Sequence, residues 1–363
     1  MKEPQENDQL RKQIEGINYD KALRKGQFIV ICFIAVLVIT VFAFWNLKID
    51  AKSFSDIWQT TNPVLLSVAL LLISMSLPFV ALRWRALYPK QIKEKANPFF
   101  LTGVLSAAFV LNVALPGPVG EFLCAGMVKQ RYKMPFTTGL ATLIVSRVIG
   151  LGSAAAIAGI MFFLFPFSIQ SEWKSALWVV TIILGLGGVG LYSMVIWPHL
   201  FQQLLQFFAK RLPSYKLITK LFAVANEVLL ALSDTANRGK KAYIESIFWA
   251  NCGHLMVGSG IYVAALAIDL QQVDWSAITF TYALSIAASV VMFMLPGSAL
   301  AWDVLFATTL KETANIALNE AITITLVIRF QQLLVAMIGV AMILLFVRGS
   351  IQLKSSAENQ LPK

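Results

Sequence analysis

Charged groups and chemically reactive motifs are scarce in this sequence. Only 13% of its 363 residues are charged, whereas about 25% is typical of a soluble domain. The chain has two histidines and three cysteines, and it contains no HExxH, GxSxG or Walker pattern. These shortages argue against a metal centre, a disulfide framework and a nucleophilic active site. We therefore expect no metal, no cofactor and no enzyme activity in this chain.

What the sequence has in excess is apolar length. Hydrophobic residues make up 58% of the chain, which is more than a soluble protein can use, because a globule of this size needs a polar exterior. Six apolar runs of 20 residues or more can each cross a hydrocarbon layer of roughly 30 Å. They are Phe28–Leu47, Pro63–Leu82, Phe136–Phe165, Ala176–Trp197, Tyr243–Ile268 and Ala321–Val347. We predict an all-α, polytopic membrane protein with about six spanning helices.

Two further apolar regions, Phe99–Val128 and Ala277–Leu310, are interrupted by helix-breaking residues. Such breaks are tolerated at membrane depth only where protein or a cavity covers the freed backbone. Basic residues flank the first region on both sides, whereas the flanks of the second are poor in Lys and Arg. The positive-inside rule therefore predicts two re-entrant helical hairpins that enter from opposite sides of the membrane. The breaks are Pro116-Gly117-Pro118 with Gly120 in the first region, and Pro296-Gly297 in the second.

The distribution of basic residues also orients the chain. Of the 30 Lys and Arg residues, 24 fall in segments that this topology places in the cytoplasm, four fall outside and two lie inside spans. We expect a multi-pass protein of a bacterial plasma (inner) membrane with both termini cytoplasmic, and we expect no nucleic-acid partner despite the net charge of +11. Residues 1–27 form a cytoplasmic segment, 28–348 the membrane domain and 349–363 a tail. A homo-oligomer is compatible with the sequence.

The membrane domain is predicted to contain an inverted repeat, with halves at residues 28–165 and 176–348 joined by cytoplasmic interfacial helices at 198–242. Each half has two spans, a Pro-Gly-broken hairpin and one long span. An acid follows each break, and an arginine follows each acid at the same interval, giving Glu121 with Arg147 and Asp303 with Arg329. The arginines lie about 16 and 12 Å into their spans, near the midplane. Inverted repeats with broken helices at the midplane are typical of secondary transporters.

These four charges need an explanation, because one charge at a helix centre costs roughly 2.5–3.5 kcal/mol. They should face the interior, pair with one another or line a wet cavity. One interpretation is two structural ion pairs that hold the halves together. The other is that the arginines, helped by half-helix N-termini, attract an anionic headgroup. The candidate substrate-binding residues are Glu121, Arg147, Asp303, Arg329, Asn112, Pro116, Gly117, Gly120, Pro296, Gly297, Arg83 and Arg85.

Three members of this set, Asn112, Arg83 and Arg85, have a simpler interpretation beside the functional one. Asn112, four residues before Pro116, is expected to cap the broken backbone. Arg83-Trp84-Arg85 lies where a span meets the cytoplasm, a position typical of an interfacial anchor.

Several motifs, in order, resemble the flippase-like, lysylphosphatidylglycerol-synthase transmembrane-region family over roughly residues 28–348. The motifs are Arg83-Trp-Arg-Ala-Leu87, Leu115-Pro-Gly-Pro-Val-Gly-Glu121, Ser146-Arg147, Leu295-Pro-Gly297 and Val327-Ile-Arg329. The chain departs from the family pattern after the second Pro-Gly, where it continues Ser-Ala-Leu-Ala-Trp-Asp303, and after Glu121, where Cys124-Ala-Gly replaces an expected arginine.

The resemblance implies translocation or handling of phospholipids or other polar lipids, so membrane lipids are the expected partners. Only the short tail 349–363 follows the last span, so we expect no soluble aminoacyl-transfer domain in this chain. Our first hypothesis is a flippase that moves an anionic or polar lipid past the midplane charges. The alternatives are an ion-coupled small-solute transporter and a non-catalytic membrane scaffold.

Overall fold

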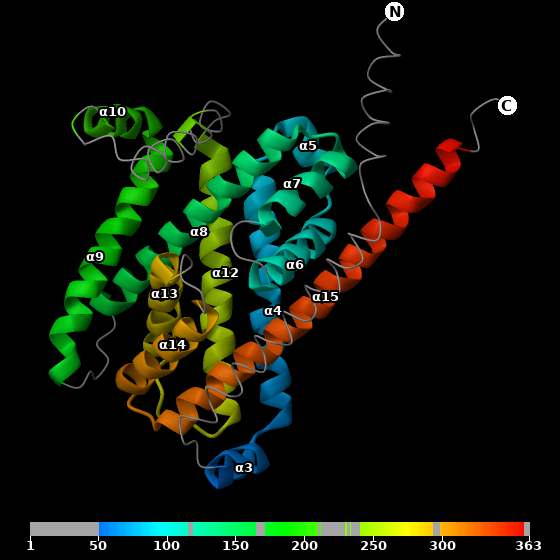
Figure 1. Cartoon of the computed structure of the whole chain (residues 1–363). Coiled ribbons are helices and arrows are strands. Elements are labelled where there is room, and N and C mark those ends of the chain that lie inside the picture. Colours follow the sequence, from blue (N-terminus) through cyan, green and yellow to red (C-terminus); the bar gives the residue numbers. More distant parts are fainter. Residues whose placement is uncertain are drawn as a thin grey trace, which may run out of the picture.

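The computed structural model describes residues 51–114, 119–164, 171–209, 211, 229–230, 233, 240–292 and 298–358. Every regular element in these residues is an α-helix (Figure 1), so the all-α class is confirmed. The helices are α3 (Ala51–Thr60), α4 (Pro63–Ala86), α5 (Lys90–Lys95), α6 (Pro98–Ala114), α7 (Val119–Tyr132), α8 (Phe136–Leu164), α9 (Ser171–Ile196), α10 (Pro198–Ala209), α12 (Lys240–Ala267), α13 (Trp275–Met292), α14 (Ser298–Ala314) and α15 (Leu318–Glu358). The expected first span, Phe28–Leu47, and the breaks Pro116-Gly117 and Pro296-Gly297 lie outside the described residues.

Four described helices are long and apolar enough to cross a membrane. They are Pro63–Ala86, Phe136–Leu164, Lys240–Ala267 and the Leu318–Leu345 part of α15. A fifth candidate, Thr181–Met194 of α9, passes the same test together with α10, from which it is bent by 108°. Each of these helices overlaps one predicted span. The multi-pass architecture is therefore confirmed, while the number of six crossings stays a prediction.

The two broken regions form helical hairpins. The arms α6, α7, α13 and α14 have 17, 14, 18 and 17 residues. At roughly 1.5 Å per residue, each arm is too short to cross a hydrocarbon layer of roughly 30 Å. In Figure 1 the α6–α7 hairpin enters from the end of the molecule where α5 and α10 lie, and α13–α14 enters from the opposite end, near α3. Each hairpin contacts both of the long helices that carry the interior arginines: α8 packs on α7 and α13, and α15 packs on α14 and α6.

The helices α4 and α12 pack extensively on each other and bring together segments that are far apart in the sequence. The backbone N–H of Asn62 donates to the carbonyl of Ala267 at 2.7 Å, which ties the start of α4 to the end of α12. Gly260 allows the close approach, since a Cβ there would lie 2.9 Å from the backbone nitrogen of Ile73. Small residues of this kind are the usual means of tight helix packing in membranes.

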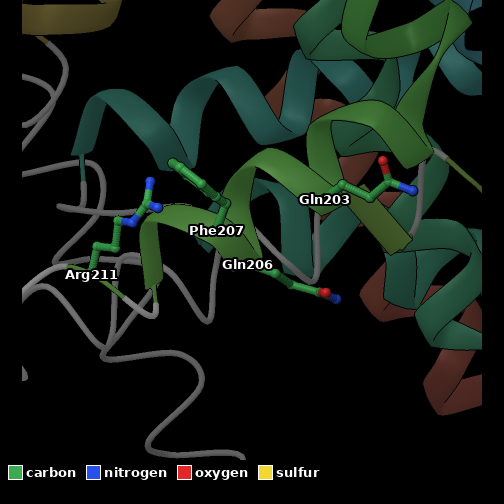
Figure 2. Close-up of a pocket in the computed structure, with 4 residues that line it drawn as sticks. All are labelled: Gln203, Gln206, Phe207 and Arg211. Carbon is green, nitrogen blue, oxygen red and sulfur yellow. The ribbon is translucent and has the colours of Figure 1, made fainter.

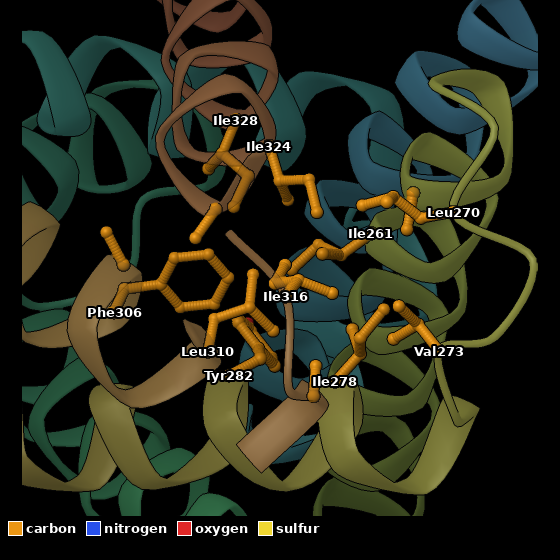
Figure 3. Packing of buried hydrophobic residues seen from close by; sticks show 14 of the residues in the cluster. Ile261, Leu270, Val273, Ile278, Tyr282, Phe306, Leu310, Ile316, Ile324 and Ile328 are labelled. Atoms are coloured by element: carbon orange, nitrogen blue, oxygen red, sulfur yellow. The ribbon is translucent and has the colours of Figure 1, made fainter. Parts of the chain in front are cut away.

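A cluster of large apolar side chains holds the second hairpin in place. Figure 3 shows Ile261 of α12, Ile278 of α13, Phe306 and Leu310 of α14, and Ile324 of α15 meeting in one buried cluster. All five side chains have zero exposed surface. Because interiors of this density tolerate little displacement, the cluster fixes how α14 faces α15, and so positions the charged residues described below.

Candidate functional site

The first hairpin carries an ion pair between Glu121 and Arg147. Glu121 lies in the first turn of α7, and Nη2 of Arg147 lies 3.3 Å from its Oε1. Arg147 is eleven residues from the start of α8, which places it about 16 Å along that helix. Among the described residues, Oε2 of Glu121 and Nε of Arg147 are buried without a hydrogen-bond partner. The pair is therefore only partly satisfied.

Asn112 connects the two arms of this hairpin. Its Oδ1 accepts from the backbone N–H of Gly120 at 2.8 Å, and its amide nitrogen donates to Oε1 of Glu121 at 3.1 Å. The expectation that Asn112 caps the broken backbone is confirmed, and the same side chain also orients Glu121. The amide thus satisfies one donor at the start of α7, where helices leave N–H groups unpaired.

We expect Gly120→Ala to destabilise this hairpin. A Cβ at position 120 would overlap the carbonyl oxygen of Ala108 and lie 2.5 Å from Oδ1 of Asn112, and backbone cannot move aside as a flexible side chain can. We expect a loss of about 1–3 kcal/mol, typical of overpacking, seen as a lower Tm of the purified protein in detergent. Gly126→Ala on the same helix is the control, because no atom lies within 4 Å of its added Cβ. Equal melting temperatures for the two variants would contradict the close approach at Gly120.

The second hairpin carries a tighter ion pair between Asp303 and Arg329. Nε and Nη2 of Arg329 both approach Oδ1 of Asp303, at 2.8 and 2.7 Å. Nη1 also donates to Oε1 of Gln332 at 2.5 Å. The guanidinium lies 5.6 Å from the centre of the Trp302 ring, within the range of a cation–π contact. The Asp303 side chain has no exposed surface, and that of Arg329 is 22% exposed.

The two pairs occupy matching positions in the chain. Each acid binds the arginine that follows it at the same interval. The structure begins α15 at Leu318, three residues before the predicted start, so Arg329 is eleven residues from its helix start, as Arg147 is. Both ion pairs join a hairpin to the long helix that follows it in the chain. Neither ion pair joins a residue of the first half (28–165) to one of the second half (176–348). Ion pairs that hold the two halves together would have to do so.

The structure brings Arg83 towards this site but not Arg85. Arg83 is 5% exposed, and its Nε donates to the hydroxyl of Ser146 at 2.9 Å, beside Arg147. Arg85 instead donates to the carbonyl of Lys93 at 3.0 Å in the neighbouring α5 segment. The site residues that we did not predict are Gln332 and Trp302, which contact Arg329. Their spacing, three residues after Arg329 and directly before Asp303, was the available indication.

Among the hollows beside the described helices, two are considered for their lining residues. The larger, of about 360 Å³, lies against α10 and is lined by Gln203, Gln206, Phe207 and Arg211 (Figure 2). The Arg211 guanidinium lies 3.7 Å from the Phe207 ring centre, and the lining residues come from one helix and its C-terminal end, with no charged pair. The smaller, of about 60 Å³, lies between α4, α12 and α13 and includes Arg83. Among the described residues, no three His, Cys, Asp or Glu side chains are grouped to hold a metal ion.

Comparison with known proteins places these features in a family context. Residues 32–339 match the family described as the lysylphosphatidylglycerol synthase TM region. A segment of 134 residues is 30% identical to the glycosyltransferase AglD of Haloferax volcanii, covering 36% of this chain and 21% of that relative. The matched part is therefore about a fifth of the relative's length. No solved structure matches the chain significantly.

Proposed function

The chain belongs to the lysylphosphatidylglycerol synthase TM region family, and from this premise we propose that it is a lipid flippase. Family membership supports a multi-pass membrane protein with a lipid-related function. The finer proposal is that a polar or anionic headgroup crosses the bilayer past the two hairpin ion pairs while the acyl chains stay in the lipid. We propose a transport role rather than a catalytic one, in the plasma membrane and with cytoplasmic termini.

The observation that carries this proposal is the exposure of Arg147. Its side chain is 43% exposed, although it lies near the middle of a 29-residue apolar helix. A guanidinium exposed to hydrocarbon at that depth is unfavourable by several kcal/mol. Nε of Arg147 is buried, and we propose that the exposed part includes the terminal nitrogens and meets water or the polar part of a lipid. A polar path at this depth is what a headgroup needs in order to cross.

The arrangement of the two hairpins supports the same mechanism. They enter from opposite ends of the molecule (Figure 1), and each contacts the long helix of the other half, α13 on α8 and α6 on α15. We propose that the halves are an inverted repeat that exposes the midplane charges alternately to the two sides. The pairs differ in exposure, 43% for Arg147 against 22% for Arg329. This difference fits a conformation in which the ion pair of the first hairpin is accessible and that of the second hairpin is closed off.

The scaffold alternative predicted from the sequence has weaker support. A scaffold needs its interior charges only as structural pairs, which fits Asp303 with the 22% exposed Arg329 better than it fits Arg147, whose side chain is 43% exposed. The relative named as a glycosyltransferase is 30% identical to this chain over 134 residues, which is about a fifth of its own length. This partial similarity does not support a glycosyltransferase activity for this chain.

The proposal is tested by reconstituting the purified protein in liposomes that contain fluorescent, tail-labelled phosphatidylglycerol. A membrane-impermeant reductant bleaches only the outer leaflet, so transfer appears as bleaching beyond that of protein-free vesicles. We expect transfer by the unaltered protein and its loss in Arg147→Ala and Arg329→Ala variants that remain folded. Arg131→Ala, outside the interior pairs, is the matched control. Wild-type transfer by a well-folded double variant, or none by the unaltered protein, overturns the proposal.

A further inference from the structure

We propose that the small cavity beside Arg83 is a phosphate-binding site. The cavity, of about 60 Å³, is formed by α4, α12 and α13, and its polar lining includes Arg83, Trp249, His254 and Tyr282. This volume holds roughly four water molecules, which is comparable to the four oxygens of one phosphate group. Arg83 lies near the first hairpin ion pair, but neither ion pair contributes a residue to the lining of this cavity. The inference therefore goes beyond the proposed function and does not depend on transport.

Arg83 brings a buried positive charge to this cavity. Its side chain is buried, and within the described part of the chain no carboxylate forms an ion pair with it. Among the described residues, the Arg83 side chain makes one hydrogen bond, in which Nε donates to the hydroxyl of Ser146, so the two terminal nitrogens of the guanidinium keep their donors. An uncompensated buried cation is destabilising by several kcal/mol. A bound anion would remove that penalty.

Trp249 adds an indole N–H that has no acceptor among the described residues. Nε1 of Trp249 is buried and has no hydrogen-bond partner among the described residues, and Trp249 lines the same cavity. An indole nitrogen can only donate, so its missing partner must be an acceptor. A buried donor left unpaired costs about 1–3 kcal/mol. Two separate residues, on α4 and α12, therefore both lack an acceptor at one place.

The other polar side chains that line the cavity are His254, Tyr282 and Ser76, and each has a hydrogen-bond partner in the protein. Nε2 of His254 lies 2.8 Å from the carbonyl of Gly150, and because a carbonyl only accepts, that nitrogen carries the proton. Nδ1 then accepts from the hydroxyl of Tyr282 at 3.5 Å, which is at the limit of a hydrogen bond. This long contact uses the one proton of the Tyr282 hydroxyl, which can turn to a bound phosphate oxygen instead at the loss of a weak hydrogen bond. The Ser76 hydroxyl already donates to the carbonyl of Ile73 at 2.7 Å.

The set of groups selects an oxyanion. No Asp or Glu lines the cavity in the described part of the chain, so a cation would find no counter-charge there. The planar guanidinium fork matches two oxygens of a phosphate, and the indole and phenol can each donate to another. The phosphate can be the phosphodiester of a lipid headgroup or free phosphate. Both sources share the chemistry that the site recognises.

Binding is measured by isothermal titration calorimetry on the full chain in a phosphate-free detergent. The probes are inorganic phosphate, short-chain phosphatidylglycerol and, as a phosphate-free comparison, a diacylglycerol with the same chains. We expect at least one phosphate probe to bind and the diacylglycerol not to bind. Binding of both phosphate probes in competition identifies one shared site. Binding of the lipid alone or of inorganic phosphate alone supports the site and identifies its source.

Variants localise the site. Trp249→Phe keeps an aromatic ring at a position that stacks on Phe79 with centroids 5.7 Å apart, and removes the pyrrole part of the indole together with its N–H. We expect it to weaken phosphate binding roughly tenfold, as loss of one hydrogen bond to a charged group does. Arg83→Lys keeps the charge and removes the fork, with a similar effect expected. Trp178→Phe and Arg131→Gln, outside the cavity, are the matched controls.

No binding of either phosphate probe overturns the inference, as does undiminished binding in a folded Trp249→Phe variant. Because the assay has no membrane and no transport readout, lipid transfer without phosphate binding would overturn only this site. Phosphate binding without lipid transfer would overturn only the flippase proposal.

Discussion

Asp303→Ala is expected to lower the free energy of unfolding by about 3–5 kcal/mol, the usual effect of removing one partner from a buried ion pair. Asp303 has no exposed surface and receives two nitrogens of Arg329, at 2.7 and 2.8 Å. Without the carboxylate, the guanidinium keeps only weaker partners in a low-dielectric interior, including Gln332 and the Trp302 ring. Unfolding in detergent, followed by circular dichroism with denaturant, measures the change.

Two further variants separate the charge from the packing. Asp303→Leu combined with Arg329→Leu removes both charges, and we expect it to regain most of the lost stability, because apolar replacement of a whole buried pair is often neutral. Lys311→Ala breaks the more exposed pair with Glu312 on the same helix, where Lys311 is 44% exposed, and should change stability by less than about 1 kcal/mol. An Asp303→Ala variant as stable as the unaltered protein would contradict the burial of this pair.

The double variant also bears on function. If the folded Asp303→Leu, Arg329→Leu protein still transfers lipid at the original rate, the second pair serves only to stabilise the hairpin. If transfer is lost while stability is regained, the charges themselves take part in moving the headgroup. The same two measurements thus distinguish a transporter from a scaffold.

Much of the architecture could be predicted because long apolar runs and basic flanks have few physical solutions in a membrane. The overlap of four predicted spans with helices follows from this. The matched interval between acid and arginine also indicated which charged residues meet. In each half it reaches from the start of a returning hairpin arm to the middle of the next long helix, and the structure places Glu121 against Arg147 and Asp303 against Arg329 there.

The surroundings of Arg83 could not be predicted in the same way. A basic residue near the end of a span is usually expected to reach out to the interface, and α4 is apolar around its circumference, so hydropathy does not show which side faces the protein. Adjacent residues of a helix point about 100° apart. As a result, Arg83 lies buried against Ser146, whereas Arg85, two residues on, contacts Lys93. The directions of the Arg83 and Arg85 side chains therefore depend on how segments far apart in the sequence pack together.

Reversing the charge of Arg147 is expected to have the largest effect on transport. Arg147→Glu places a second carboxylate opposite Glu121, at the position where the two side chains now meet at 3.3 Å. Two acids at one midplane site repel an anionic headgroup and remove the cation that would bind it. Loss of one hydrogen bond to a charged group alone weakens binding by about 1.5–3 kcal/mol. We therefore expect transfer of phosphatidylglycerol to fall by roughly 10–100-fold or more, measured in the liposome assay.

The charge-swapped double variant, Glu121→Arg with Arg147→Glu, decides what the pair does. It restores opposite charges, so we expect stability to recover in part, and only in part because an arginine in the first turn of α7 opposes the helix dipole. Transfer should stay low, since the cation has moved from the middle of α8 to the start of the hairpin arm. Lys129→Glu, an exposed change near the end of α7, controls for the loss of positive charge. Wild-type transfer by the swapped protein would mean that only the presence of a pair matters, and that Arg147 does not itself hold the headgroup.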